Sequence, residues 1–199
     1  GVAVALRNLS FEQARKGNEV IIFAPGHKNK RIGKEKLAPN LTVIHIPSLD
    51  IGFLYPDFRL ALPITLPTSL YELIRFKPDI IHYHTPLTTG FEAIMASKIL
   101  NKPLVGTFHT FIADPAYLQH LRLKNAKITR KIVWGYNNFF YKACDIVTTP
   151  SQAAKKKLKE KGLKKVEVVS NPILCEEFKN PQHPGSYFKK RYKLKTNVI

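Results

Sequence analysis

Three histidines stand where apolar segments turn polar, and they are the residues best suited to chemistry in this sequence. His82 and His84 lie near the end of Asp79–Thr85 (DIIHYHT), and His109 lies near the end of Pro103–Thr110 (PLVGTFHT). A neutral imidazole can donate a hydrogen bond to an oxyanion or a sugar hydroxyl, and it can act as acid or base near neutral pH. Because side chains alternate along a strand, His82 and His84 share one face. They could form a metal pair, but no Asp, Glu or Cys ligand is obvious beside them, so we expect no metal site and no cofactor.

A helix between these two segments would bring His84 and His109 together. Residues Leu87–Leu100 follow a helical pattern, so the three segments make a strand–helix–strand unit. In a parallel sheet both polar ends fall at the same edge. Ligands of open parallel sheets bind outside the carboxyl ends of the strands. The sequence therefore predicts that His84 and His109 face one cleft.

Strands alternate with helices along the rest of the chain, which is typical of an α/β protein with a parallel sheet. The other strands are expected at 18–24, 41–47, 144–150 and 166–170, and the other helices at 1–17, 68–76, 126–143 and 152–161. Residues 25–40 are expected to form a loop, and residues 179–196 are a polar stretch rich in Pro, Gly and Lys. A doubly wound domain usually begins with a strand, whereas this chain enters a helix at once. We therefore expect a first strand to be missing before Gly1.

The segment 48–67 is apolar but interrupted by prolines, which excludes a single helix or a central strand. Within it, FLYPDFRLALP places Tyr55 and Arg59 among apolar side chains. Such a segment either lines a site for an apolar ligand or packs over the sheet, and the sequence leaves both interpretations open.

The longest helical pattern, residues 126–143, has two faces that differ in charge. The expected core stripe consists of Ile128, Ile132, Tyr136, Phe139 and Ala143. The other face carries Lys127, Arg130, Lys131, Trp134 and Tyr141. A basic face with Trp and Tyr suits a membrane interface, although a solvated face with one partly buried Trp has the same composition.

The charge of the chain is strongly positive and unevenly distributed. The 199 residues carry a formal net charge of +18, and residues 119–199 hold 19 basic against 5 acidic side chains. Such asymmetry indicates an anionic partner, which could be nucleic acid, an anionic lipid surface or a phosphorylated substrate. A lysine-rich solvated surface is the alternative. No groove-reading motif or RNP-type aromatic pattern is present, so no nucleic acid is expected.

Several other classes are excluded by what the sequence lacks. It has no apolar run approaching the roughly 20 residues of a membrane span. It has no Walker phosphate loop, no G-x-S-x-G elbow and no H-E-x-x-H motif. Two cysteines are too few for a disulfide framework. At 44% hydrophobic content, the chain can build one sizeable core, or one core and a fragment of a second.

Several segments, in this order, resemble the amino-terminal half of a retaining glycosyltransferase of family four, which has the GT-B fold of two Rossmann-like domains. These segments are Gly1-Val2 with the following helix, RKGNEVIIFAPG, PDIIHYHTPLTTG, PLVGTFHTF, CDIVTTPSQAAKKKL and VEVVSNPI. The resemblance implies a Rossmann-like acceptor domain over residues 1–178, with its first strand apparently missing. It implies that residues 179–199 form an interdomain linker and the start of an absent donor-binding domain. Without that domain the fragment is expected to be inactive.

The resemblance also implies roles for individual residues. His109 matches a family histidine that contacts the donor sugar beside the reaction centre, and Gly1 matches a glycine whose backbone meets the donor diphosphate. The acceptor-binding residues would be His84, Thr85, Thr110, Tyr55 and Arg59. The membrane-contact residues would be Lys127, Arg130, Lys131 and Trp134.

Within the family, YPDFRLALP and FHTF look most like enzymes that glycosylate membrane lipids. The resemblance therefore implies transfer of a hexose from a nucleotide sugar to a diacylglycerol-like or phosphoinositide-like acceptor. It implies a cytoplasmic enzyme, peripheral on the inner face of the cell membrane. A soluble sugar or sugar-phosphate acceptor is the alternative, and a basic nucleic-acid-binding module is a remote one.

Overall fold

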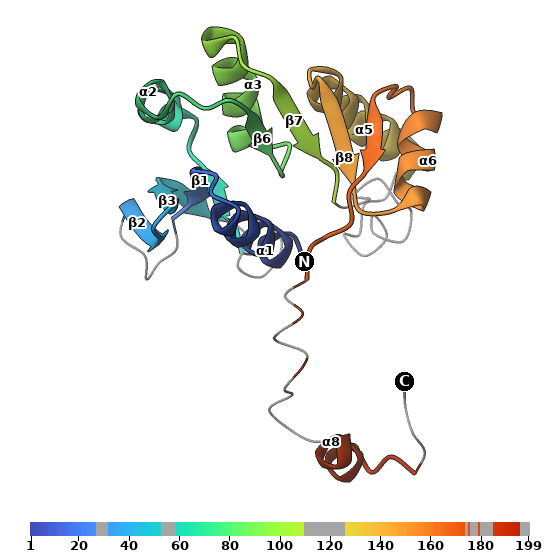
Figure 1. Ribbon diagram of the computed structural model, residues 1–199. Helices are drawn as coiled ribbons and strands as arrows, with labels where there is room; N and C mark the ends of the chain where they lie inside the picture. The colour runs from blue at the N-terminus through green and yellow to red at the C-terminus, as the bar shows by residue number, and fades with distance from the viewer. Residues whose placement is uncertain are drawn as a thin grey trace.

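The computed structural model describes residues 1–26, 32–52, 59–109, 126–173, 175, 179 and 185–195. Helices alternate with strands along this part of the chain, and the strands build two sheets and a short hairpin (Figure 1). The predicted α/β class is confirmed.

The amino-terminal part contains helix α1 (Val2–Arg15) and a three-stranded sheet of order β1-β3-β2. Strands β1 (Val20–Pro25) and β3 (Leu41–Ile46) are parallel, and β2 (Gly33–Ala38) pairs antiparallel with β3. Strand β2 lies in the segment predicted to be a loop, so that prediction is wrong. Its sequence GKEKLA has little intrinsic strand preference, and cross-strand pairing with β3 supplies the conformation that the sequence does not favour.

Two short strands and a helix follow. Strands β4 (Ser48–Asp50) and β5 (Arg59–Ala61) pair antiparallel, and the 3-10 turn η1 (Pro63–Thr65) leads into helix α2 (Leu66–Phe76). The proline-interrupted segment therefore contains neither a long helix nor a central strand in its described parts.

The second sheet carries the histidines. Its four parallel strands have the order β6-β7-β8-β9, with β6 at Ile81–Tyr83, β7 at Leu104–Thr107, β8 at Ile146–Thr149 and β9 at Val166–Val168. Helices α3 (Thr88–Leu100), α5 (Ala126–Lys142) and α6 (Gln152–Glu160) connect them. Ser151 caps α6, since its hydroxyl oxygen accepts a hydrogen bond from the Ala154 amide at 3.2 Å.

The carboxyl-terminal polar stretch contains a short helix. Helix α8 (Gly185–Tyr192) lies in the polar stretch 179–196, and Figure 1 shows it apart from both sheets. An i,i+4 bond from Arg191 to the Tyr187 hydroxyl stabilises this short helix.

Among the described strands, β1 and β6 each have a hydrogen-bonded neighbour on one side only. The expected strand before Gly1 stays a prediction.

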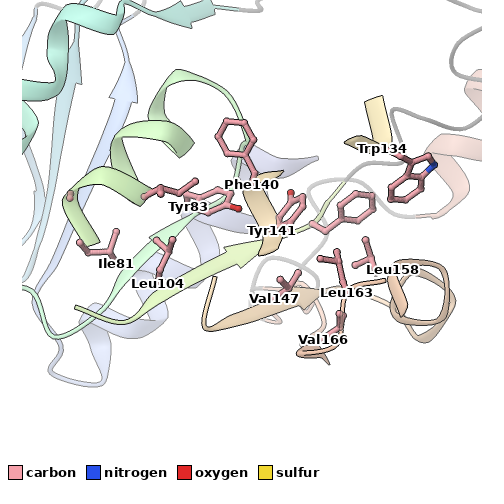
Figure 2. Packing of buried hydrophobic residues seen from close by; sticks show 13 residues of the cluster. Ile81, Tyr83, Leu104, Trp134, Phe140, Tyr141, Val147, Leu158, Leu163 and Val166 are labelled. Carbon is pink, nitrogen blue, oxygen red and sulfur yellow. The ribbon is translucent and has the colours of Figure 1, made fainter. Parts of the chain in front are cut away.

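Aromatic side chains from α5 fill the core beside β6 and β7. Figure 2 shows Phe140 and Tyr141 packed near Tyr83, with Trp134 farther along the same cluster. The Trp134 ring stacks on Phe108 at 6.3 Å between centroids. Tyr141 stacks on Tyr83 at 5.8 Å and donates a hydrogen bond to the Thr107 carbonyl at 3.3 Å.

The predicted orientation of the helix at 126–143 is therefore wrong. All five residues of its expected core stripe are exposed: Ile128, Ile132 and Phe139 are each more than 60% accessible, Tyr136 is 43% accessible, and Ala143 is also exposed. Trp134 and Tyr141 are buried, so neither can contact a membrane. The face expected to be basic also carries these aromatic side chains, and their aromatic partners on β6 and directly after β7 decide that this side of the helix is buried.

Gly106 permits the close packing of this core. A Cβ at this position would lie 2.8 Å from the Cys144 sulfur and 2.9 Å from the Tyr83 ring. We expect Gly106→Ala to lower the free energy of unfolding by about 1–3 kcal/mol, the usual cost of overpacking. Urea denaturation of the purified chain would measure the change.

Gly135, on the exposed side of α5, provides a matched control. A Cβ added there would meet no atom within 4 Å. Gly135→Ala should therefore stabilise the chain by about 0.5–1 kcal/mol through helix propensity. A Gly106→Ala protein as stable as the parent would contradict the close contact with Tyr83 and Cys144.

Candidate functional site

The site is built on the carboxyl ends of β6 and β7. Parallel pairing aligns Tyr83 with Gly106, so His84 and His109 leave the sheet at the same edge. Nδ1 of His84 lies 2.9 Å from Nε2 of His109, and the two rings stack at 5.2 Å between centroids. The prediction that these two histidines meet at one edge is confirmed, and their roles stay predictions.

His82 joins this pair to the sheet. Its ring lies 4.2 Å from the His84 ring between centroids, as expected for two side chains on one strand face. Nε2 of His82 lies 2.6 Å from the Thr107 hydroxyl, which lies 2.7 Å from the Thr148 hydroxyl. A continuous line of polar contacts therefore runs from β6 across β7 to β8. The two threonines were not identified from the sequence, because a threonine in a strand is usually structural.

The three imidazoles are neutral at neutral pH. Burial, together with the charges of His82 and His109, lowers the pKa of His84 to about 3. Burial and the charge of His109 lower the pKa of His82 to about 4. Part of this residue is open to solvent, but its ring lies between His84 and Thr107 and is therefore enclosed. Burial lowers the pKa of His109. These side chains act as hydrogen-bonding groups, not as cations.

The start of α1 lies close to this site. Gly1 lies near His109, and Figure 1 shows the N-terminus on the side toward which β7 points. Gly1 is the N-cap of α1, no side chain caps this end, and the first turn holds no acidic residue. Uncapped amides at a helix start carry partial positive charge and suit an anionic ligand.

Two of the predicted acceptor residues, Thr85 and Arg59, line one cavity of about 50 Å³. The remaining lining comes from β1, the hairpin and the start of α3: Pro25, Leu60, Ala61, Leu87, Thr88 and Thr89. Arg59 is held in place by Ser48 and Asp50, through Nε to the Ser48 hydroxyl at 3.0 Å and Nη1 to the Asp50 carboxylate at 3.2 Å. A space of this size holds about one or two waters and is too small for a hexose. Tyr55 and Thr110 lie outside the described residues.

A buried carboxylate behind this cavity was missed by the sequence reasoning. Glu92 of α3 is 6% exposed and accepts hydrogen bonds from the hydroxyls of Thr65 and Ser69, the latter at 3.1 Å. These bonds fasten α3 to η1 and α2, and so fix the loop that carries Thr85. A lone acid within the apolar run FEAIMA at the start of α3 was the signal that could have found it.

The predicted membrane-contact residues have different positions. Lys131 is exposed and Arg130 is partly exposed, whereas Trp134 is buried in the core. The side chain of Lys127 lies outside the described part of the structure. The exposed Tyr136 of the same helix donates a hydrogen bond to the Pro86 carbonyl, in the loop that follows His84 and Thr85.

The described residues show neither a cluster of metal ligands nor a helix suited to span a membrane. No group of three or more His, Cys, Asp or Glu residues there could hold a metal ion. No described helix combines the length and the apolar character that crossing a bilayer requires.

Comparison with known proteins identifies what this chain is similar to. The sequence model of Glycosyltransferase Family 4 matches residues 1–177. The fold matches that of sucrose-phosphate synthase from Thermosynechococcus elongatus, with a TM-score of 0.69 and 14% identity over 98% of this chain and 47% of that one. This likeness confirms the predicted Rossmann-like fold of one half of a GT-B protein.

Curated relatives have several different substrates in their names. The alpha-monoglucosyldiacylglycerol synthase of Streptococcus pneumoniae is 27% identical over 92% of this chain and 39% of its own length. The sulfoquinovosyl transferase SQD2 of Arabidopsis thaliana is 33% identical over 52% of this chain and 19% of its own. A GDP-mannose-dependent alpha-mannosyltransferase of Mycobacterium tuberculosis is 25% identical over 89% of this chain and 45% of its own length. The chain spans less than half the length of each of these relatives.

The burial of His84 gives the stability of the fold a pH dependence. An imidazole in the unfolded chain titrates near about 6.5, whereas the pKa of His84 in the folded chain is about 3. As the pH falls below the unfolded value, the unfolded chain gains a proton that the folded chain does not, so stability falls. We expect this residue to lower the free energy of unfolding by roughly 1–2 kcal/mol between about pH 7 and about pH 5, measured by urea denaturation.

Substitution separates this contribution from those of other titrating groups. His84→Asn should remove its part of the pH dependence. His45→Asn deletes an imidazole from β3, in the other sheet, and should leave the contribution of His84 to the pH dependence unchanged. Equal pH dependence in the parent and His84→Asn would show that His84 is not kept neutral by burial.

Proposed function

Because this chain belongs to Glycosyltransferase Family 4, we propose that it is the acceptor-binding part of a retaining glycosyltransferase. The enzyme moves a hexose from a nucleotide sugar to a membrane-lipid acceptor, diacylglycerol-like or phosphoinositide-like. The observation that carries this proposal is the His84–His109 pair at the carboxyl edge of the sheet, with the uncapped start of α1 beside it.

The remaining half of the reaction requires a donor-binding domain. We assign residues 1–178 to the acceptor domain and 179–199 to a linker and the start of the donor domain. Helix α8 then belongs to the linker. The relatives are more than twice as long as the part that this chain matches, which supports this division.

The reaction assigns separate tasks to His109 and α1. Transfer breaks the bond between the anomeric carbon and a diphosphate oxygen and forms a bond from that carbon to the acceptor oxygen. The acceptor hydroxyl gives up its proton, which the departing diphosphate oxygen accepts. The bonding electrons leave with the diphosphate, whose growing negative charge suits the amides at the start of α1 near Gly1. His109 donates a hydrogen bond to a hydroxyl of the donor sugar. Such contacts count most when they strengthen in the oxocarbenium-like transition state.

A lipid acceptor is supported by the exposed surface of α5. Ile128, Ile132 and Phe139 lie on it beside the cation of Lys131, and the helix sequence contains no Asp or Glu. Basic side chains near an anionic lipid surface contribute on the order of 1 kcal/mol each. We call Ile128, Lys131, Ile132 and Phe139 the α5 face.

The position of the α5 face agrees with this use. Tyr136, on the same side of the helix, bonds the Pro86 carbonyl in the loop of the predicted acceptor residue Thr85. The name of one relative includes diacylglycerol, and the name of another describes sulfoquinovosyl transfer. We therefore propose a peripheral enzyme on the cytoplasmic face of the cell membrane. Ile128, Ile132 and Phe139 take the place of Trp134 in its contact surface.

A soluble sugar or sugar-phosphate acceptor is the second candidate. It is favoured by the fold's likeness to sucrose-phosphate synthase and by Arg59 at the cavity beside Thr85, a cation suited to a phosphate. Transfer to a radiolabelled lipid in vesicles, compared with transfer to hexose 6-phosphates, separates the two candidates. The family match counts against a nucleic-acid-binding module.

Replacing His109 tests the catalytic assignment. We expect His109→Ala in the full-length enzyme to lower turnover by about 100-fold, the scale of losing one transition-state contact. Turnover would be measured at saturating donor and acceptor, with thermal unfolding as the check on folding. His45→Ala, which removes an imidazole from β3 in the other sheet, should keep the parent's turnover. A folded His109→Ala enzyme with unchanged turnover would remove this role.

Vesicle sedimentation tests the α5 face. We expect the protein to sediment with phosphatidylglycerol-containing vesicles at low salt, to ignore pure phosphatidylcholine vesicles and to be released by high salt, as electrostatic binding requires. Ile132→Ser with Phe139→Ser should weaken this binding by about tenfold or more, since each removes a side chain that burial in the interface stabilises.

The matched control uses another exposed apolar pair. Tyr71→Ser with Ile74→Ser removes exposed side chains of similar size from α2 and should leave vesicle binding unchanged. Equal weakening by both double variants, or equal competition by heparin and DNA, would mean that the surface binds any polyanion. The soluble-acceptor candidate would then replace the lipid one.

A further inference from the structure

We propose that Thr149, at the end of β8, is a positioning residue for His109. Its hydroxyl donates a hydrogen bond to the Phe108 carbonyl at 3.2 Å, one residue before His109. A carbonyl group lies in one plane with the nitrogen and the Cα of the next residue. Fixing the Phe108 carbonyl therefore fixes the direction in which the chain enters His109. This inference rests on the proposed function only in the task given to His109, which is contact with the donor sugar.

The sequence of β8 explains why a side chain makes this bond. The backbone ladder between β7 and β8 extends to Phe108, whose amide donates to the Thr148 carbonyl at 2.8 Å. The next carbonyl, that of Thr149, accepts from the Val169 amide at 3.0 Å, on the side of β9. In a trans peptide the nitrogen of residue 150 then faces the opposite way, toward β7. Because residue 150 is proline, it has no hydrogen to donate, and the Thr149 hydroxyl is the donor instead.

Burial makes the loss of this bond costly. Thr149 has no exposed surface, and Phe108 is 3% exposed. A buried carbonyl that loses its donor raises the free energy of the folded chain unless its peptide turns to find another partner. Such a turn would move the Cα of His109, which belongs to the same peptide. The ring of His109 would then leave its place at 2.9 Å from Nδ1 of His84.

The side chain of Phe108 is held by other contacts. Its ring lies 6.3 Å from the Trp134 ring and 5.6 Å from the Tyr141 ring between centroids. These contacts fix the ring inside the core, but they leave the peptide between Phe108 and His109 free to rotate. The hydrogen bond from Thr149 restrains that rotation. It therefore acts on the placement of His109 and less on the packing of the core.

Two substitutions at Thr149 separate the hydroxyl from the shape of the side chain. Thr149→Val keeps the branched shape and removes the donor, whereas Thr149→Ser keeps the donor. We expect Thr149→Val in the full-length enzyme to lower kcat by about 10- to 100-fold, the scale of misplacing a catalytic group. The KM for acceptor should change little, since His109 contacts the donor sugar. Thr149→Ser should retain most of the turnover.

Ser97→Ala provides a matched control for general loss of stability. The Ser97 hydroxyl donates to the Lys102 carbonyl at 2.7 Å, before the opposite end of β7, and the residue is nearly buried. This variant loses a bond of the same kind and should keep the parent's kcat. The proposal would be overturned by equal loss of kcat in Ser97→Ala and Thr149→Val. A folded Thr149→Val enzyme with the parent's kcat would overturn it as well.

A second substitution should rescue the first. Pro150→Ala gives residue 150 an amide hydrogen on the side of β7, where it can donate to the Phe108 carbonyl. We expect Thr149→Val with Pro150→Ala to recover a large part of the turnover that Thr149→Val loses. A folded double variant as slow as Thr149→Val would show that the donor to this carbonyl is not what the enzyme needs, and the proposal would fail.

Nuclear magnetic resonance of the 199-residue chain decides the inference without turnover. A buried, hydrogen-bonded hydroxyl proton exchanges slowly with water, so we expect a hydroxyl signal from Thr149 in the parent chain at low temperature. Its absence would overturn the proposal even if Thr149→Val did not fold. Burial lowers the pKa of His109, and this pKa should rise toward its ordinary value in Thr149→Val but not in Ser97→Ala. A parent enzyme that transfers no sugar would defeat the proposed function, while these spectra would still decide the role of Thr149.

Discussion

The alignment of β6 with β7 is the constraint on which the site depends. Pairing of Tyr83 with Gly106 sets the register, and the absence of a side chain at Gly106 leaves room for the Tyr83 ring and the Cys144 sulfur. A slip of one residue would move every side chain of β7 to the other face of the sheet. Because the register is held by buried packing, the two histidines beyond the strand ends meet without any covalent or metal link.

The parts of the fold that could be predicted are those for which local pattern and burial agree. Short apolar segments ending in His-Thr, with a helical pattern between them, were enough to bring His84 and His109 to one edge. The orientation of α5 could not be predicted, because both of its faces carry large apolar or aromatic side chains and the choice is made by Tyr83 and Phe108, which are distant in sequence. Strand β2 was missed because its pairing with β3, not its composition, makes it a strand.

The candidate site was only partly accessible from the sequence. Strand-end positions identified the histidines, but the contacts among them depend on angles and distances that no spacing encodes. The threonine hydroxyls that support His82 and the carboxylate of Glu92 behind the acceptor loop lie in patterns that usually indicate plain packing. Polar residues of this kind become recognisable only when their partners from other elements are in view.

The bond between Tyr136 and Pro86 adds a polar link between helix α5 and the loop that follows β6. Helix α5 presents apolar side chains outward, while Pro86 follows directly on the residues beside the histidine pair. A shift of α5 would therefore reach this loop through the Tyr136 hydroxyl as well as through the packing of Phe140 against the start of α3 at Gly90. If α5 rests on a membrane as we propose, the rate of transfer would then follow the area of surface available to each molecule, not the bulk concentration of substrate.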